Sequence, residues 1–236
     1  MELRKFKVLS FDCYGTLIDW DSGLKAQIQM IAPDIDPEEL LGKYAVHEAR
    51  IEHEDPTAPY RQVVAQAAKA MADEIGRPIS MEQATAIGHS VGTWPPFPDS
   101  VDALARLKQH CTLVVLSNTD RQSFAGSSAQ LGDPFDGVLL AEDIGSYKPS
   151  LKNFEALNTW LAEHGYSHDE HLHVAQSLFH DHVPGKACGW TTAWINRRNG
   201  MEGEGASGPM LDVTPDYEFP DMKSFADAMD ASVAGS

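Results

Sequence analysis

The sequence predicts an α/β protein: a parallel sheet covered by helices and interrupted after its first strand by a block of helices. Two patterns predict this fold. Short, wholly apolar runs alternate with helical segments from about residue 100 onward, as in parallel strands that are buried on both faces. A similar run near the N-terminus is separated from them by residues 22–90, which have helical periodicity and no strand pattern.

The first strand is expected at residues 8–11, where an apolar run gives way to Asp12 and Gly15. Later apolar runs predict strands at residues 113–116, 137–141, 172–175, 191–195 and 217–219. Helical patterns predict helices at residues 101–108, 153–164, 183–188 and 222–229. Residues 199–209 are Gly-rich and are expected to form a mobile loop, and residues 231–236 are expected to be disordered.

The intervening block divides into four expected helices. Their ranges are residues 24–31, 37–51, 60–75 and a segment that starts after Ser80. Pro37 followed by acidic residues is typical of a helix start, and Ser80 with Gln83 predicts a helix cap. Residues 94–98, Trp-Pro-Pro-Phe-Pro, form a stiff linker. We therefore expect a core domain of residues 1–20 and 98–236 and a helical domain of residues 21–97.

The composition narrows the expected partners and compartment. The chain has 18 Lys and Arg against 35 Asp and Glu, a formal net charge of −17, so neither nucleic acid nor an anionic membrane is an expected partner. A pocket for an anionic substrate would have to be locally positive. No apolar run approaches the ~20 residues of a membrane span, and no signal peptide is apparent. Three cysteines without C-x-x-C spacing indicate reduced thiols in the cytoplasm, Cys13 among them as a small core residue.

Four polar clusters fall at the ends of expected strands. They are Asp12 to Thr16, Ser117 with Asn118, Lys148, and Ser177 to Asp181. The carboxyl ends of parallel strands share one edge of a sheet, so we expect these clusters in one crevice, where ligands bind in open α/β sheets. A buried Asp12 would need partners or a catalytic role, and the alternative is that it caps the next helix.

Residues 11–17, Phe-Asp-Cys-Tyr-Gly-Thr-Leu, resemble motif I of the haloacid dehalogenase (HAD) superfamily and are most similar to the type II 2-haloacid dehalogenases. The four clusters match the order of motifs I to IV over almost the whole chain, and residues 194–197, Trp-Ile-Asn-Arg, also resemble this subfamily. The resemblance implies a Rossmann-like core with an inserted helical cap domain. It also implies a homodimeric hydrolase that uses no metal or other cofactor and removes halide from a small 2-haloalkanoic acid, a haloacetate or a 2-halopropionate.

By this resemblance Asp12 is the nucleophile. Its carboxylate would attack the carbon that bears the halogen and form an ester, and water would then attack the carbonyl carbon of that ester. Lys148 would pair with Asp12 and keep it ionised, and Asp181 would hold Lys148 or position the water. Thr16 and Ser117 would orient carboxylates by hydrogen bonds.

The leaving group distinguishes the two enzymatic hypotheses. HAD phosphatases carry a second Asp two residues after the nucleophile as general acid and base, and this chain has Tyr14 there. A halide leaves as an anion and needs no proton, so Tyr14, expected to line the pocket, favours displacement at carbon, and the Asn118 amide would hold the halide. The alternative is a Mg²⁺-dependent phosphatase, in which Asp12 is phosphorylated and Asp181 holds the metal. A binding protein without turnover is the third hypothesis.

The chain departs from the family pattern at a substrate-binding cation. Relatives carry an Arg on the second cap helix that grips the substrate carboxylate, and an ungapped alignment puts Tyr44 at that place. The nearby cations are Lys43, His47, Arg50 and Arg61. The first three share one helix face, and Arg50 is the candidate for substrate binding, the alternative being a solvated surface.

The last motif also departs, because Ser177-Leu-Phe-His180 replaces the Ser-Asn pair that precedes its Asp in the family. Ser177 and His180 are candidates for substrate binding, and His180 is a candidate to act on the hydrolytic water. The run His180-Asp181-His182 is not expected to hold a metal, because consecutive residues cannot all point at one centre. The remaining histidines of this region are expected to be exposed or core imidazoles: His168, His171 and His173.

Overall fold

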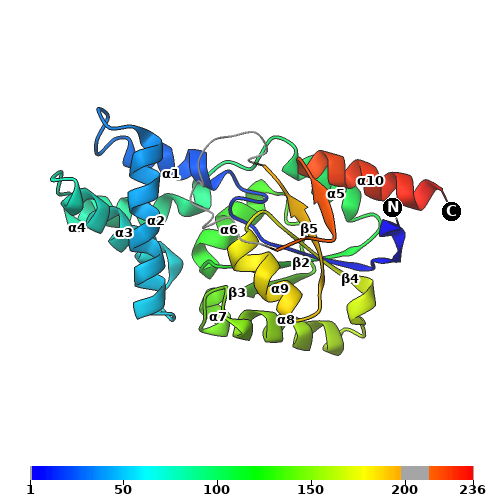
Figure 1. The fold of residues 1–236 in the computed structure, drawn as a ribbon. Coiled ribbons are helices and arrows are strands. Elements are labelled where there is room, and N and C mark those ends of the chain that lie inside the picture. The colour runs from blue at the N-terminus through cyan, green and yellow to red at the C-terminus, as the bar shows by residue number, and fades with distance from the viewer. Residues whose placement is uncertain (1, 198–212, 236) are drawn as a thin grey trace.

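A computed structural model describes residues 2–197 and 213–235 as a six-stranded, wholly parallel sheet in the order β3-β2-β1-β4-β5-β6 (Figure 1). The strands are β1 (Val8–Phe11), β2 (Thr112–Ser117), β3 (Gly137–Leu140), β4 (His171–Ala175), β5 (Thr191–Ile195) and β6 (Tyr217–Phe219). The chain builds outward from β1 to β3 on one side and then crosses to β4 on the other. The strand order therefore reverses beside β1, and a crevice forms at the carboxyl ends of the strands there.

Helices cover both faces of the sheet (Figure 1). They are α5 (Ser100–Leu107), α6 (Arg121–Gln130), α7 (Ala141–Ile144), α8 (Leu151–Glu163), α9 (Val183–Ala187) and α10 (Met222–Ala234). On one face, Phe154 and Leu157 of α8 pack against Val114 of β2. The larger core cluster includes Leu104 of α5 and Phe225 of α10. Burial on both faces explains why β1 has no exposed residue.

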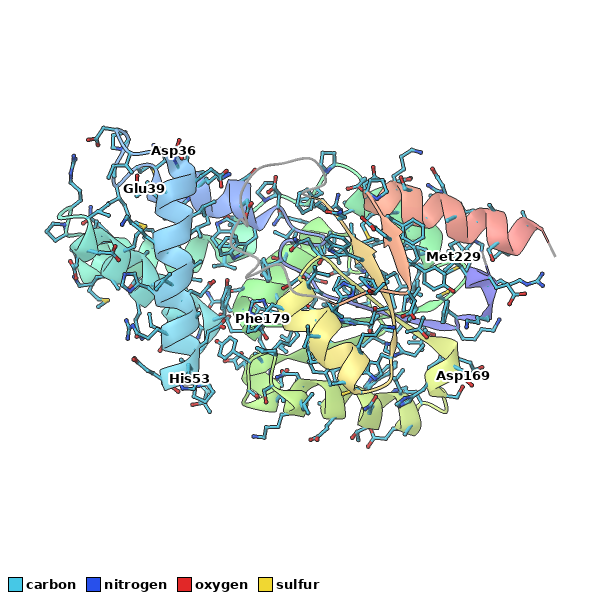
Figure 2. The ribbon with its side chains drawn as sticks, in the orientation of Figure 1. Asp36, Glu39, His53, Asp169, Phe179 and Met229 are labelled. Atoms are coloured by element: carbon cyan, nitrogen blue, oxygen red, sulfur yellow. The ribbon has the colours of Figure 1, made fainter. Side chains whose placement is uncertain are left out.

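Four helices follow β1 and stand together at one side of the sheet in Figure 1. They are α1 (Trp20–Ile28), α2 (Pro37–Glu54), α3 (Tyr60–Glu74) and α4 (Met81–Ser90). The Asp36 side chain caps α2, whose ends are marked by Asp36 and His53 in Figure 2. Ser80 and Gln83 form the expected capping box of α4. We call α1 to α4 the inserted helices.

Short helical turns connect some of these elements. They are the 3₁₀ turns η1 (Leu3–Lys5), η2 (Val91–Thr93) and η3 (His168–Glu170) and the π-helical turn η4 (Leu178–His182). No helix in the described ranges is long and apolar enough to cross a membrane. Cys13 is fully buried beside the sheet, as expected for a small core residue, and burial raises the pKa of its thiol.

Two expectations about single elements were wrong or incomplete. The sequence pattern did not predict α6, which is rich in Ser and hardly amphipathic and is defined instead by Asp120, whose side chain caps it. Disorder was expected from residue 231, but α10 continues to Ala234, and the Ser232 hydroxyl accepts a hydrogen bond from the Arg4 amide. The loop expected at residues 199–209 lies outside the described residues.

Candidate active site

A buried lysine joins the ends of three strands. Lys148 follows β3 and α7, and its Nζ lies 2.9 Å from Asp12 Oδ1, directly after β1, and 2.7 Å from Asp181 Oδ1, in η4 after β4. It also donates to the carbonyl of Leu116 in β2, at 3.0 Å. All three charged side chains are at least nine-tenths buried. The structure thus brings together three of the four predicted clusters around one ammonium group.

The second oxygen of Asp12 is held by the loop that follows it. Thr16 Oγ1 donates to Asp12 Oδ2 at 2.6 Å and accepts the Gln176 amide at 2.9 Å. The loop turns at Gly15, whose φ of +87° favours glycine. The Arg197 guanidinium donates to the carbonyl of Thr16, at 2.9 Å. Asp12 is therefore fixed from both sides, with the hydrogen bond that was expected of Thr16.

Asp12, Lys148 and Asp181 form a buried trio whose charges depend on one another. Burial alone would lower the pKa of Lys148, but the two carboxylates raise it above its ordinary value. Burial would raise the pKa of Asp181, but Lys148 and His173 hold it well below its usual range. Burial raises the pKa of Asp12, and Lys148 and Thr16 act against this rise. Lys148 is thus a charged group at neutral pH, positioned to keep a negative charge on Asp12.

A chain of buried polar groups supports Asp181 from within the sheet. His173 Nε2 lies 3.0 Å from Asp181 Oδ1, and its Nδ1 lies 2.7 Å from the Ser10 hydroxyl. Ser10 in turn lies 2.6 Å from His171 Nε2. Both histidines are core imidazoles, as expected, but the contact with Asp181 was not foreseen. The sequence feature that could have indicated this contact is a polar residue, Ser10, in the apolar first strand together with two histidines in the strand at residues 171–175. Ser10 and His173 are paired in the sheet.

The groups expected to bind halide and carboxylates are arranged differently from the prediction. Ser117 Oγ is buried and has no hydrogen-bond partner among the described residues, where its expected bond to a carboxylate is not formed. The Asn118 side chain donates to the Lys148 carbonyl at 3.0 Å and accepts the Lys148 amide at 2.7 Å. Asn118 therefore fixes the Lys148 backbone with one of its two N–H groups. Ser117 and Asn118 both line the cavity described below.

Residues 177–182 point to separate partners. The Ser177 hydroxyl accepts the His180 amide at 3.1 Å and lies 3.1 Å from His180 Nδ1. His182 Nε2 donates to the carbonyl of Ala175, at 2.9 Å, while Asp181 faces Lys148. Burial lowers the pKa of His180 to about 4, so its imidazole is neutral at pH 7. In the parts of the chain that the structure describes, no three His, Cys, Asp or Glu side chains are grouped to hold a metal ion.

A cavity of about 460 Å³ opens between Asp12 and the inserted helices. Its lining residues include Asp12, Tyr14, Trp20, Asp21, Glu48, Glu52, Tyr60, Ser117, Asn118, Lys148, Gln176, Ser177, Phe179, His180 and Asp181. Phe179 is labelled in Figure 2, between the helices of the sheet and α2. The Tyr14 ring faces this cavity as expected, but its hydroxyl pairs with the Ser127 hydroxyl at 2.9 Å. The volume is in the range of small-molecule sites, ~300–1,000 Å³.

The predicted substrate-binding cation does not line this cavity. The Arg50 guanidinium pairs with Glu54 at 2.6 Å and is half exposed. Lys43 and His47 both pair with Glu74, at 2.9 and 2.8 Å. The face with residues 43, 47 and 50 thus carries ion pairs, consistent with the solvated alternative.

The adjacent face of α2 supplies the cavity wall instead, and sequence reasoning missed it. Glu48 and Glu52 line the cavity and lie about one helical turn apart, with Tyr44 one turn before them, and this spacing was the available signal. Glu48 Oε1 accepts the Tyr44 hydroxyl at 3.0 Å and the Tyr60 hydroxyl at 2.9 Å. Burial raises the pKa of Glu48 to about 7, and burial together with Glu48 raises that of Glu52.

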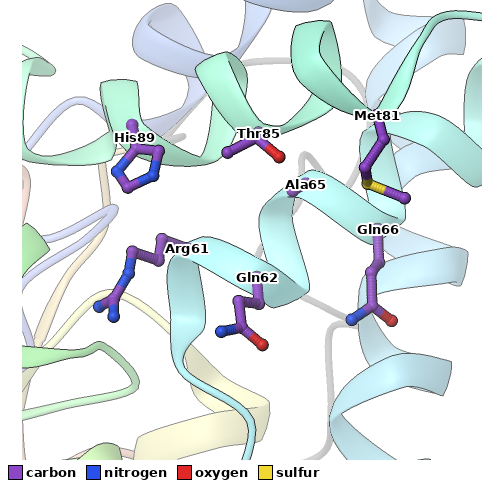
Figure 3. A pocket seen from close by; sticks show the side chains of 7 residues that line it. All are labelled: Arg61, Gln62, Ala65, Gln66, Met81, Thr85 and His89. Carbon is purple, nitrogen blue, oxygen red and sulfur yellow. The ribbon is translucent and has the colours of Figure 1, made fainter.

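A second cavity, of about 400 Å³, lies between α3 and α4 (Figure 3). Its lining residues are Arg61, Gln62, Ala65, Gln66, Met81, Thr85 and His89. Arg61 pairs with buried Asp120 at 2.7 Å and so links α3 to the sheet domain. No carboxylate or thiol is among the described residues that line this second cavity, whereas Asp12 lines the first.

The sheet is parallel, and a buried trio of carboxylate, lysine and carboxylate lies at the ends of its strands, beside the inserted helices. This arrangement is typical of α/β enzymes, whose sites lie at the carboxyl ends of the strands. The sequence model of the haloacid dehalogenase-like hydrolases matches residues 6–162. The chain belongs to this family.

Individual relatives are more distant. An (S)-2-haloacid dehalogenase of Pseudomonas sp. (strain YL) is 28% identical over 140 residues, which span 58% of this chain and 56% of that protein. An L-2-haloacid dehalogenase from Xanthobacter autotrophicus, solved with chloropropionic acid covalently bound, superposes with a TM-score of 0.80 at 19% identity, covering 95% of this chain and 98% of that one. A putative HAD-hydrolase from Bacillus subtilis bound to magnesium gives 0.75 at 16% identity, covering 95% and 99%. These structural likenesses establish the shared fold.

Proposed function

We propose that this protein hydrolyses the carbon–halide bond of a small 2-haloalkanoic acid through nucleophilic attack by Asp12. The observation that carries the proposal is the setting of Asp12: a carboxylate at a strand end, held by Lys148 and Thr16, that lines a cavity of about 460 Å³. Tyr14 stands where a phosphatase of this family needs an acid, and its hydroxyl is occupied by Ser127. The named relatives supply the substrate class.

The reaction would proceed in two steps. The Asp12 carboxylate attacks the carbon opposite the halogen, an oxygen–carbon bond forms, and the halide leaves with the bonding electrons. Water then attacks the carbonyl carbon of the ester, which releases the hydroxy acid and restores the carboxylate. The neutral imidazole of His180 lines the same cavity and can accept the proton of that water. Lys148 stabilises the negative charge on Asp12 before the first step and after the second.

The experiment is halide release from chloro-, bromo- and fluoroacetate and from both 2-chloropropionates, in EDTA. Wild type should release halide, and Asp12→Asn should fall to about the uncatalysed rate, because the nucleophile is lost. Asp34→Asn, which alters an exposed carboxylate paired with Arg77, is the matched control and should retain activity.

Two further measurements separate this mechanism from its rivals. After turnover in ¹⁸O-labelled water, mass spectrometry should find the label in the peptide that contains Asp12, because water attacks the Asp12 carbonyl. Release of phosphate from phosphate esters that requires Mg²⁺, without halide release, would instead support the phosphatase. Inactivity toward both panels would support a binding protein.

A further inference from the structure

The wall that the inserted helices contribute to the cavity carries three carboxyl groups among small and apolar residues. The carboxyl groups belong to Glu48 and Glu52 of α2 and Asp21 of α1. Among the described lining residues Lys148 is the sole Lys or Arg, and its Nζ already contacts Asp12 and Asp181 at 2.9 and 2.7 Å. A substrate carboxylate at this wall would find no free cation among the described lining residues to balance its charge, which is unfavourable in a partly desolvated site.

Aromatic side chains also line the cavity. Trp20 and Tyr60 come from the inserted helices, and Tyr14 and Phe179 come from the segments that follow β1 and β4. The Tyr14 and Tyr60 rings lie 6.1 Å apart between centroids, and the Trp20 indole N–H donates to the Tyr60 hydroxyl at 2.9 Å, which fixes both rings. Alkylammonium groups bind between aromatic ring faces and carboxylates, because the ring face carries partial negative charge and the carboxylate a full one.

The opposite end of the cavity independently indicates a bound polar ligand. Ser117 Oγ, on a side chain 2% exposed, and Asp181 Oδ2 are buried and have no partner in the described structure, although both residues line the cavity. Buried polar atoms without partners are costly, so a ligand that reaches them would be stabilised. The cavity therefore has a polar end beside Asp12 and an acidic, aromatic end at α2.

We propose that the α2 end of this cavity binds an organic ammonium group, with Glu48 and Glu52 as the residues that select it. The consequence for catalysis rests on the proposed displacement by Asp12: the preferred substrate carries a positively charged nitrogen on the carbon chain away from the halogen.

Ammonium binding should release protons near neutral pH. Glu48 has a pKa of about 7, and the positive charge of the ligand would favour its ionised form. The titratable and charged groups around the two carboxyls come from all the packed elements: Asp12, Asp21, Tyr44, Tyr60, Tyr147, Lys148, His180 and Asp181. Of these, His180 is neutral and Lys148 is charged across pH 6–8, so neither of them contributes to proton release in this range.

The test is calorimetric binding of choline at pH 8, compared with its uncharged isostere 3,3-dimethylbutan-1-ol. Choline should bind at least about tenfold more tightly than the isostere. Glu48→Gln and Glu52→Gln should each weaken choline by about tenfold without changing the isostere. Glu54→Gln, on the exposed side of α2, is the control and should leave choline binding unchanged. Titrations at pH 7 in buffers of different ionisation enthalpy should show proton release in wild type.

Equal affinity for choline and its isostere, or choline binding that both Gln variants retain, would overturn the proposal. Its failure is distinguishable from failure of the proposed reaction. Halide release from haloacids by a protein that does not select choline refutes the subsite alone. Choline selection without halide release from any compound refutes the displacement alone. If both hold, a 2-haloalkanoic acid that carries an ammonium group at the far end of its chain should lose halide faster than the same acid without that group, and this preference should be lost in Glu52→Gln.

Discussion

Replacing Glu48 by Gln should stabilise the protein at pH 8 and leave its stability nearly unchanged at pH 4.5. The Gln side chain has almost the same shape, and its amide oxygen can still accept the Tyr44 and Tyr60 hydroxyls that now bond to Glu48. What the substitution removes is the cost of a carboxylate charge in this partly buried position. A group that selects ligands at the expense of stability is typical of binding sites.

The magnitude follows from the pKa of Glu48, which burial raises from 4.5 to about 7. The folded protein holds the Glu48 proton up to about pH 7, whereas the unfolded chain releases it near its ordinary pKa. The free energy of unfolding of wild type therefore falls as the pH rises from about 4.5 to about 7, and it does not fall further on this account above pH 7. The difference of 2.5 pKa units sets a limit of ~3.4 kcal/mol, and water at this partly exposed site reduces the expected gain to about 1–2 kcal/mol.

Urea unfolding of wild type and Glu48→Gln from pH 4.5 to 8 measures this directly. The difference in unfolding free energy should grow between pH 5 and 7 and then stay level. The matched control is Glu54→Gln, whose exposed carboxylate pairs with Arg50 and should change stability by less than about 0.5 kcal/mol at any of these pH values. A Gln variant that is less stable than wild type at pH 8, or a gain independent of pH, would refute the reasoning.

Two other substitutions test the trio and the pocket. Lys148→Met should abolish halide release and lower the free energy of unfolding by about 3–5 kcal/mol at pH 7, because it leaves two carboxylates, Asp12 and Asp181, buried without their cation. Unchanged stability in urea at pH 7 would contradict this. Tyr14→Phe should keep halide release within about threefold and cost about 1 kcal/mol in unfolding, because the hydroxyl contacts Ser127. A hundredfold fall in its turnover would instead assign the hydroxyl a role in catalysis.

Prediction from sequence succeeded where the signal is local. Largely apolar runs gave β1 to β5, because a parallel strand buried on both faces is mostly apolar, and β6, of three residues, was predicted as a strand at the edge of the sheet. Proline and capping residues gave the limits of α2 and α3 to within a few residues and the start of α4. The exception, α6, has no apolar stripe of its own, and its position depends on Asp120, which also binds Arg61 of α3.

The sequence by itself determined the parallel sheet, the inserted helices and the residues at the strand ends, since each depends on short-range pattern or on the rule that parallel strands end at one edge. Only the tertiary structure decided how these side chains pair and which face of α2 meets the cavity. Residues 43, 47 and 50 and residues 44, 48 and 52 are both helically spaced and both polar. The choice between them depends on how the helix packs against Trp20 and Tyr60, a contact between segments distant in the chain.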